Sequence, residues 1–286
     1  MPRKNFLWMI VLILFLLCGC TTNQLRPEIT ESTKPQSETV QTSHTEPLDE
    51  STSPDAEKFA SIEGFVTADS KNSNTPCLIH LKTYRNTQTD YTSYDLCIEV
   101  NIGSNVLKKV LASRATNTPA DSLYLGDVDG DGIQEILVHN NTGGVGGFGL
   151  WRTFVLKVHG NDIGILFKNF DEFDTGFESR FLNGYQMEVK NRLTDYTLVF
   201  DIREEHKNYI ADSKELPDGN ISLDPFYVFE PQDKDNDGIS EILCKQYTSY
   251  RCHADYTGIA CSVLKFNNQT QVFEVIDAWY EPYASE

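Results

Sequence analysis

The chain has 286 residues, 23% of them charged, and a formal net charge of -18 at neutral pH. This length allows one or two domains with a sizeable core. The acidity argues against a nucleic-acid partner, because phosphates would be repelled. It suits divalent cations or basic partners, and it also keeps a secreted protein soluble.

The N-terminus has the form of a secretory signal. Arg3 and Lys4 precede an apolar run over residues 6–17, which is shorter than the roughly 20 residues that span a bilayer. The following LCGC, residues 17–20, resembles the lipobox of bacterial lipoproteins. The resemblance implies a signal peptide over residues 1–20, with Cys20 lipidated on the extracytoplasmic face of the cell membrane. The alternatives are ordinary secretion with cleavage nearby and a retained anchor helix.

Residues 21–58 are rich in Ser, Thr, Pro and Glu and poor in large apolar side chains. Such a segment cannot bury enough apolar surface to offset the entropy lost on ordering. We therefore expect a disordered tether between the lipid anchor and a folded domain over residues 59–286.

Short β-rich runs separated by polar or glycine-rich turns fill this domain. The runs are CLIHLKTYR, SYDLCIEVNI, EILVHN, WRTFVLKV, YTLVFDI, FYVFE, EILCKQY, ACSVLKF and QVFEVIDAWY. The best helical segment is NVLKKVLASRA, which fits a strand followed by a loop equally well. The pattern predicts an all-β domain.

One unit of the sequence occurs twice. DVDGDGIQE at 127–135 aligns with DKDNDGISE at 233–241, and the EILV that ends the first unit aligns with EILC in the second. Further on, FVLKV at 154–158 aligns with SVLKF at 262–266. Each copy reads as acidic loop, strand, polar loop, strand, which indicates a modular β architecture.

Each acidic loop has the residue types of a calcium site. The oxygen ligands would come from three alternating aspartates, the carbonyl of an isoleucine and a closing glutamate, and a glycine permits the sharp turn. Such a flexible shell of oxygen atoms suits Ca²⁺ better than Mg²⁺. The predicted ligands of two Ca²⁺ ions are Asp127, Asp129, Asp131, Ile133 and Glu135 in the first loop, and Asp233, Asp235, Asp237, Ile239 and Glu241 in the second. The loops are not EF-hands, because the twelfth position is Val138 or Cys244 in place of glutamate.

DVDGDGIQEILV and DKDNDGISEILC resemble the calcium loops of FG-GAP or VCBS repeats, which join the strands of β-propeller blades, as in integrin α heads. Those repeats commonly have aspartate at the ninth position, where this chain has Glu135 and Glu241. The resemblance covers roughly residues 121–158 and 227–266. It implies a β-propeller-like domain, and about 220 residues could make only a small propeller of roughly four blades. An incomplete propeller or a two-sheet β fold is the alternative.

A plainer interpretation of both loops is that they are Asp-Gly turns without metal. If calcium binds, we expect a structural role for it, because each loop leads directly into a packed strand.

Two weaker patterns do not support a site. The G-x-G-x-x-G of residues 144–149 precedes a strand, so no helix N-terminus is available to hold a pyrophosphate. Cys252, His253, Asp255 and Cys261 fit no standard zinc spacing.

Five cysteines follow Cys20: Cys77, Cys97, Cys244, Cys252 and Cys261. Disulfides are allowed outside the cytoplasm, and the odd count leaves at least one thiol unpaired. Cys77 and Cys97 flank a predicted hairpin and are a candidate pair. Plain buried thiols are the alternative.

Aromatic residues gather near the second repeat and the C-terminus: Tyr247, Tyr250, Tyr256, Trp279, Tyr280 and Tyr283. They fit a platform for a glycan or another ligand. Core packing and edge-strand positions are the ordinary explanation.

These features together predict a surface-anchored lipoprotein with a calcium-stabilised β-repeat domain. We expect a binding, adhesion or structural module with an unidentified protein or glycan ligand. The chain has no H-E-x-x-H, G-x-S-x-G or glycine-lysine phosphate loop, so we do not expect an enzyme. The alternative is a cell-envelope hydrolase, which needs an acid/base pair of perturbed pKa away from the loops.

Overall fold

The computed structural model describes residues 57–86, 93–114, 121–141, 151–169, 173–182, 185–203, 221–250 and 256–283. All of these lie in one compact unit that runs from Ser51 to Glu286. The predicted signal peptide, Cys20 and the segment 144–149 lie outside the described residues. The first strand begins at Glu57, so residues 57 and 58, assigned above to the tether, are part of it.

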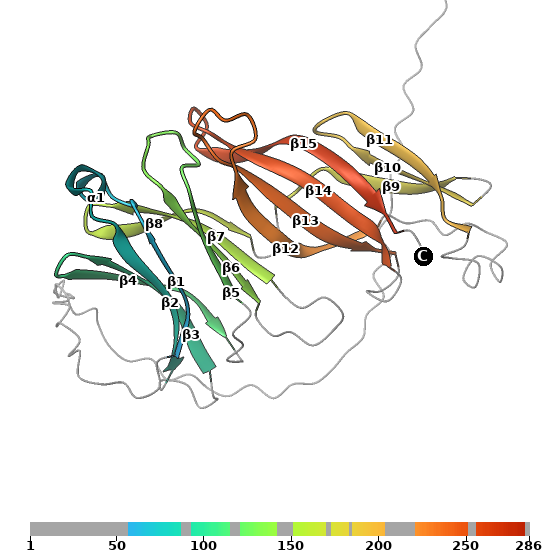
Figure 1. Cartoon of the computed structure of the whole chain (residues 1–286). Coiled ribbons are helices and arrows are strands. Elements are labelled where there is room, and N and C mark those ends of the chain that lie inside the picture. The colour runs from blue at the N-terminus through green and yellow to red at the C-terminus, as the bar shows by residue number, and fades with distance from the viewer. Residues whose placement is uncertain are drawn as a thin grey trace, which may run out of the picture. The chain divides into compact units, whose positions relative to one another are not determined.

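Within these ranges the chain forms fifteen strands and one short helix (Figure 1). They are β1 Glu57–Gly64, α1 Ala68–Ser73, β2 Cys77–Asn86, β3 Ser93–Ile102, β4 Asn105–Arg114, β5 Asp121–Gly126, β6 Glu135–Asn141, β7 Trp151–His159, β8 Asp162–Asn169, β9 Phe177–Leu182, β10 Gln186–Asn191, β11 Tyr196–Asp201, β12 Ser222–Gln232, β13 Glu241–Ser249, β14 Tyr256–Asn267 and β15 Val272–Pro282. The all-β prediction is therefore confirmed.

The strands form four antiparallel sheets, each built from consecutive strands. The first sheet contains β1–β4, the second β5–β8, the third β9–β11 and the fourth β12–β15. Neighbours in each sheet are also neighbours in sequence, so no strand crosses over another to reach its partner. The second and fourth sheets contain the two copies of the repeat, at matching strands.

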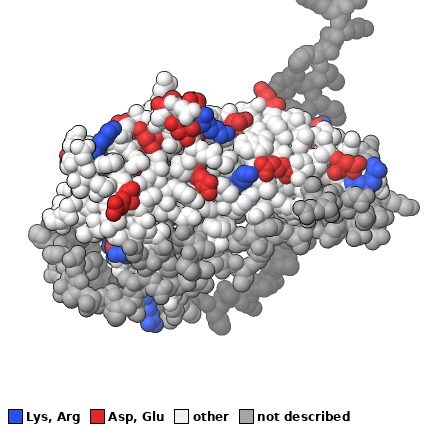
Figure 2. Space-filling view, in the orientation of Figure 1, with Lys and Arg blue, Asp and Glu red and all other residues white. Residues whose placement is uncertain are grey.

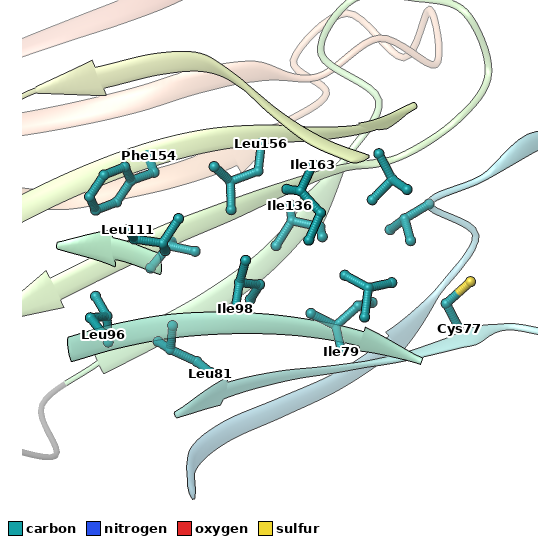
Figure 3. Close-up of a cluster of buried hydrophobic side chains, with 14 residues drawn as sticks. Cys77, Ile79, Leu81, Leu96, Ile98, Leu111, Ile136, Phe154, Leu156 and Ile163 are labelled. Atoms are coloured by element: carbon teal, nitrogen blue, oxygen red, sulfur yellow. The ribbon is translucent and has the colours of Figure 1, made fainter. Parts of the chain in front are cut away.

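Three clusters of buried apolar side chains hold the sheets together. The first core cluster joins the first and second sheets, with Ile98 of the first sheet facing Ile136 of the second (Figure 3). The second joins the second and fourth sheets, and the third joins the third and fourth, through Met187 and Ala260 among others. Full burial of one such large side chain contributes roughly 1.5–3 kcal/mol.

Strand β6 shows why the run EILV is apolar throughout. Successive side chains of a strand point to opposite faces. Ile136 and Val138 pack in the first core cluster, while Leu137 packs in the second. Both faces of the strand are therefore covered, and alternation of polar and apolar residues is lost.

The segment NVLKKVLASRA takes the strand alternative of its two interpretations, as β4. Val106 and Val110 are 49% and 53% exposed, whereas Leu111 is buried in the first core cluster and Leu107 packs against it. This period of two is that of a strand with one buried face.

The helix α1 was not predicted, because six residues are too few to show a helical period. Thr67 and Ser70 form a capping box at its start, and Asn74 ends it in the left-handed conformation, with φ of 55°. Within the described residues, no helix has the length and apolarity needed to cross a membrane.

The candidate disulfide between Cys77 and Cys97 is wrong, since both are buried free thiols. Cys97 lies opposite Lys82, which is five residues along β2 from Cys77. Five strand residues span roughly 17 Å, far beyond the reach of a disulfide. Cys244 and Cys261 are also free and buried, and Cys252 lies outside the described residues.

Candidate metal centres

The two acidic loops occupy the same place in two sheets. The first connects β5 to β6 and the second connects β12 to β13. Each therefore links the first two strands of a four-stranded antiparallel sheet. The predicted order of acidic loop, strand and later strand is present in both copies.

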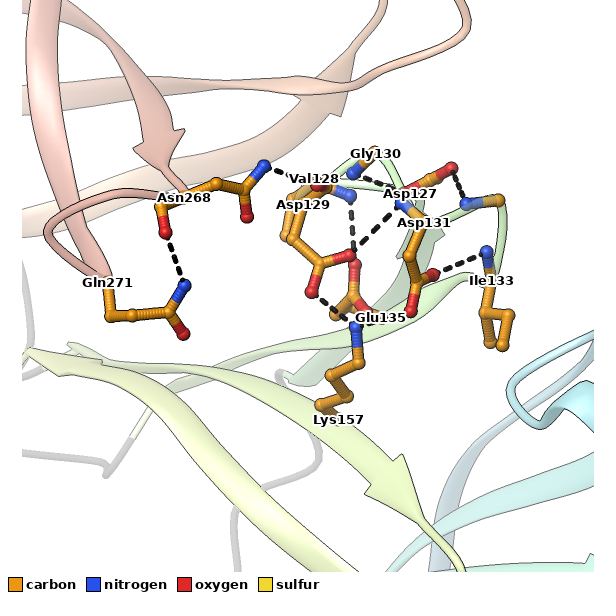
Figure 4. Close-up of polar contacts among 11 residues, drawn as sticks. Asp127, Val128, Asp129, Gly130, Asp131, Ile133, Glu135, Lys157, Asn268 and Gln271 are labelled. Carbon is orange, nitrogen blue, oxygen red and sulfur yellow. Dashed lines mark hydrogen bonds and ion pairs between the residues drawn. The ribbon is translucent and has the colours of Figure 1, made fainter.

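Backbone N–H groups fold the first loop around its own carboxylates (Figure 4). The two carboxylate oxygens of Asp127 accept hydrogen bonds from the N–H groups of Gly130 and Gly132, at 2.8 and 2.7 Å. Both glycines have positive φ, near 75° and 78°, which side chains disfavour. Asp131 accepts a hydrogen bond from the N–H of Ile133 at 2.8 Å.

The second loop repeats this pattern. Asp233 accepts hydrogen bonds from the N–H groups of Asp237 and Gly238, at 3.1 and 3.0 Å. Asp237 accepts one from Ile239 at 2.7 Å. Gly238 has φ of 89°, so the glycine before the isoleucine permits the same turn in both copies.

The loops bring carboxylates close together, although not every predicted ligand. Ligand oxygens of Asp127, Asp129 and Glu135 lie within 4.8 Å of one another, and so do those of the second-loop aspartates. These are Asp233, Asp235 and Asp237. Asp131 and Glu241 lie outside these two groups. A ligand role for the carbonyls of Ile133 and Ile239 stays a prediction.

The glutamate that ends each loop is buried. Glu135 has a fully buried side chain, and its Oε2 accepts a hydrogen bond from the N–H of Val128 at 2.9 Å. Its Oε1 accepts no hydrogen bond within the described residues. Burial raises the pKa of Glu135 to about 7, against the opposing effect of that Val128 N–H. Burial therefore disfavours the charged form of this carboxyl group.

Two lysines that the sequence analysis missed place positive charge beside the carboxylates of the loops. Lys157 of β7 donates hydrogen bonds to Asp129 and to Asp131, the latter at 2.8 Å, and its Nζ lies 3.3 Å from Glu135. Burial alone would lower the pKa of Lys157, but its hydrogen bonds to these aspartates outweigh burial and raise it. Lys265 of β14 donates to Glu241 at 2.7 Å.

The repeat contains the signal for both lysines. Lys157 and Lys265 take the same place in the aligned runs FVLKV and SVLKF. A lysine within an otherwise apolar strand needs a polar partner. The acidic loop of the same copy is the nearest source of one.

The residues present fit a calcium ion. The donor set consists of carboxylate oxygens, which a hard divalent cation prefers. In the first loop, Asp127, Asp129, Asp131 and Glu135 carry four potential negative charges, and among the described residues the ammonium in contact with them is that of Lys157. The buried Glu135 Oε1 accepts no hydrogen bond within the described residues and has the Lys157 ammonium at 3.3 Å, so it is available as a further oxygen ligand.

The first loop is tied to neighbouring parts of the fold, including the end of the second loop, whereas most of the second loop is open to solvent. Asn268, in the turn between β14 and β15, donates to the carbonyl of Asp129 at 2.7 Å, and Ser240 N–H donates to that of Asp127 at 2.6 Å. On the other side, Lys71 of α1 donates to the carbonyl of Gly132. All residues 233–238 of the second loop are exposed.

Aromatic rings line one part of the fourth sheet. Tyr227 stacks on Tyr247 with ring centroids 3.9 Å apart, and Tyr256 meets Tyr247 and Tyr283 edge to face at 5.5 and 5.1 Å. Tyr280 is instead buried in the third core cluster. The glycan or ligand platform stays a prediction, and Cys252, His253 and Asp255 of the zinc pattern lie outside the described residues.

A polar row on the first sheet was also missed. Ser61, His80, Glu99 and Lys108 are successive cross-strand partners on β1 to β4. Ser61 Oγ lies 2.8 Å from His80 Nδ1. Glu99 accepts hydrogen bonds from Lys82 and from a tyrosine of the same sheet. This carboxylate is already neutralised, so the row does not favour the hydrolase alternative.

Ion pairs offset part of the acidity at the surface. Figure 2 shows acidic and basic side chains close together on the described part of the viewed face. Arg180 makes two hydrogen bonds to Glu188, and Lys245 lies 3.1 Å from Glu281. Exposed pairs of this kind contribute little to stability, because solvent screens them.

The chain is similar to a protein of Bacillus subtilis (strain 168), named uncharacterized protein YybI. The two are 30% identical over 163 residues, which cover 53% of this chain and 60% of that protein. Residues 175–281 match the family model of the YybI C-terminal domain. This segment contains nearly all of the third and fourth sheets and the second acidic loop. No solved structure matches the chain.

Proposed function

We propose that the protein is a lipoprotein held by Cys20 on the outer face of the bacterial cell membrane. Its calcium-stabilised β-repeat domain serves there as a binding, adhesion or structural module. Residues 21–56 are the tether between the lipid and this domain. The ligand, a protein or a glycan, is recognised away from the metal centres, because both loops are committed to holding their own strands.

The observation that carries the proposal is the pairing of two acidic loops. Each gathers three carboxylates within 4.8 Å at the same connection of a four-stranded sheet. Gathering like charges costs free energy unless a cation offsets the repulsion. A single cluster of this kind is common without metal, but two matching copies with equivalent internal hydrogen bonds favour a shared ligand.

Calcium bound in each loop would supply positive charge to carboxylates that a single lysine only partly neutralises. The chain's own residues would position the ligands of the ion. Backbone N–H groups orient the aspartates, and the buried glutamate fixes the start of the next strand. Strands β6 and β13 start at Glu135 and Glu241. An ordered loop therefore fixes where each of these two strands begins and so keeps its buried side chains in place.

We extend the FG-GAP or VCBS resemblance to the single sheets, which are blade-like antiparallel units of four strands. A closed propeller packs each blade against the next along the chain. Here the core clusters join the first sheet to the second, the second to the fourth and the fourth to the third. This order favours a related multi-sheet β arrangement over a closed ring.

Calcium titration of the purified full-length protein tests the proposal. We expect binding heat and a rise in melting temperature, because a ligand that binds only the folded state stabilises it. Asp129→Ala should remove the first site and Asp235→Ala the second. Lys190→Met, on the exposed face of β10 in the third sheet, is a control that should change neither.

Absence of heat and of stabilisation at millimolar calcium would contradict the proposal. The acidic loops would then be turns that hold no metal, and the propeller-repeat resemblance would lose its functional content.

A further inference from the structure

The ammonium group of Lys157 lies among the carboxylates that calcium would use. It donates hydrogen bonds to Asp129 and Asp131 and lies 3.3 Å from Glu135 Oε1 (Figure 4). The side chain reaches these groups from β7, the strand next to β6 in the sheet, and is only 21% exposed. Metal entering the first loop must therefore compete with this cation.

Lys265 makes the equivalent approach in the second loop but engages it less. Its Nζ donates to Glu241 at 2.7 Å and comes no nearer than 3.9 Å to Asp237. Asp233 and Asp235 are exposed. The group of three aspartates that faces solvent is thus left largely free of the lysine.

Glu135 is an independent sign that the first loop is built for a cation. Its side chain is completely buried, and its Oε1 points into the loop without a hydrogen bond from any described residue. A buried carboxylate is costly unless it is paired and hydrogen-bonded. The ammonium at 3.3 Å offsets the charge without supplying that hydrogen bond.

We propose that Lys157 sets the calcium affinity of the first loop by competing with the metal from inside the fold. The first loop then keeps its structure at low calcium and binds the ion weakly. The second loop, which its lysine leaves more open, binds calcium first. This inference rests on the proposed calcium function and assigns different affinities to its two sites.

The experiment isolates the first loop by removing the second site. Calcium binding is measured by calorimetry in purified full-length Asp235→Ala protein, with and without Lys157→Met. We expect the Lys157 substitution to tighten calcium binding by at least about tenfold, because a competing charge at contact distance is lost. Lys190→Met in the same background keeps the original affinity.

Thermal melting provides the second readout. In EDTA, Lys157→Met should melt below the parent protein, since the carboxylates lose their counter-ion. Added calcium should raise the melting temperature of Lys157→Met by more than it raises that of the parent protein. Lys157→Gln, which keeps hydrogen-bond donors but no charge, is the milder substitution if the methionine variant does not fold in EDTA, and it should shift in the same directions.

Two results would overturn the inference in distinguishable ways. Calcium binding at the first loop that is unchanged by Lys157→Met and Lys157→Gln would leave the calcium function standing and remove the role of Lys157. No binding in the wild type or in any variant would remove the calcium function together with the inference.

Discussion

At the scale of single residues, the glutamate at the ninth position of each loop accepts a hydrogen bond from the backbone of the second position. Glu135 Oε2 reaches back to the N–H of Val128, and Glu241 Oε2 lies 3.4 Å from the N–H of Lys234. Both donors are second in their loops, so the glutamate closes the turn across its full width. The longer side chain suits this distance better than the aspartate that is commoner in similar repeats.

His139 gives a residue-scale prediction for pH. Its Nε2 lies 2.8 Å from the carbonyl oxygen of Phe226, and its ring stacks on Trp151. Burial lowers the pKa of His139 to about 4, against the opposing effect of the hydrogen bond to Phe226. In the unfolded chain the pKa is near 6.5. Stability is then fully present above pH 6.5 and falls as the pH drops towards 4.

We expect the wild type to lose about 2–3 kcal/mol more unfolding free energy than His139→Gln between pH 7 and pH 4.5. Urea unfolding at the two pH values measures this difference. Equal losses in the two proteins would show that His139 is not a buried neutral group.

At the scale of elements, the sequence predicted strands wherever turn residues bound an apolar or alternating run. It did not predict β1, β5, β8, β9 and β10 as separate strands, because their apolar residues are few or their turns weak. The acidic loops were predicted because all of their residues are contiguous. The two lysines were missed since each lies more than 20 residues from its loop, and only pairing across the sheet brings them together.

Gly126, at the end of β5, gives an element-scale prediction. A Cβ at this position would lie 2.9 Å from Pro231 Cβ and from Ser240 Oγ. Gly126→Ala should therefore destabilise the protein by about 1–3 kcal/mol through overpacking. Gly164→Ala in β8, where the nearest atom lies at an ordinary 3.6 Å, is the matched control in urea unfolding. Similar unfolding midpoints for the two variants would refute the close approach of β5 to the fourth sheet.

At the scale of the whole molecule, the sequence indicated the sheet content but not which sheets pack together. Periodicity reports whether a face is buried, and it carries no information about the partner. The second sheet packs against the fourth in the second core cluster, where the ring of Phe229 stacks on that of Phe167, more than 60 residues earlier in the chain. Only the folded chain identifies such contacts.

Membrane attachment is tested on the whole protein in a bacterial host. We expect radiolabelled palmitate in the wild type and its loss in Cys20→Ala, because the lipobox resemblance assigns the lipid to that thiol. Cys18→Ala should keep the label, since a small residue is all that this position requires. Label in Cys20→Ala, or none in the wild type, would exclude the predicted anchor.

The most direct test of the calcium function is a crystal structure of the protein grown with calcium. The proposed function predicts an ion in each acidic loop, with carboxylate oxygens of the aspartates at about 2.3–2.6 Å. The competition by Lys157 further predicts that the second loop fills at the lower calcium concentration. Acidic loops without a bound ion at millimolar calcium, in which the carboxylates contact only lysine and water, would contradict the claim that both loops bind calcium.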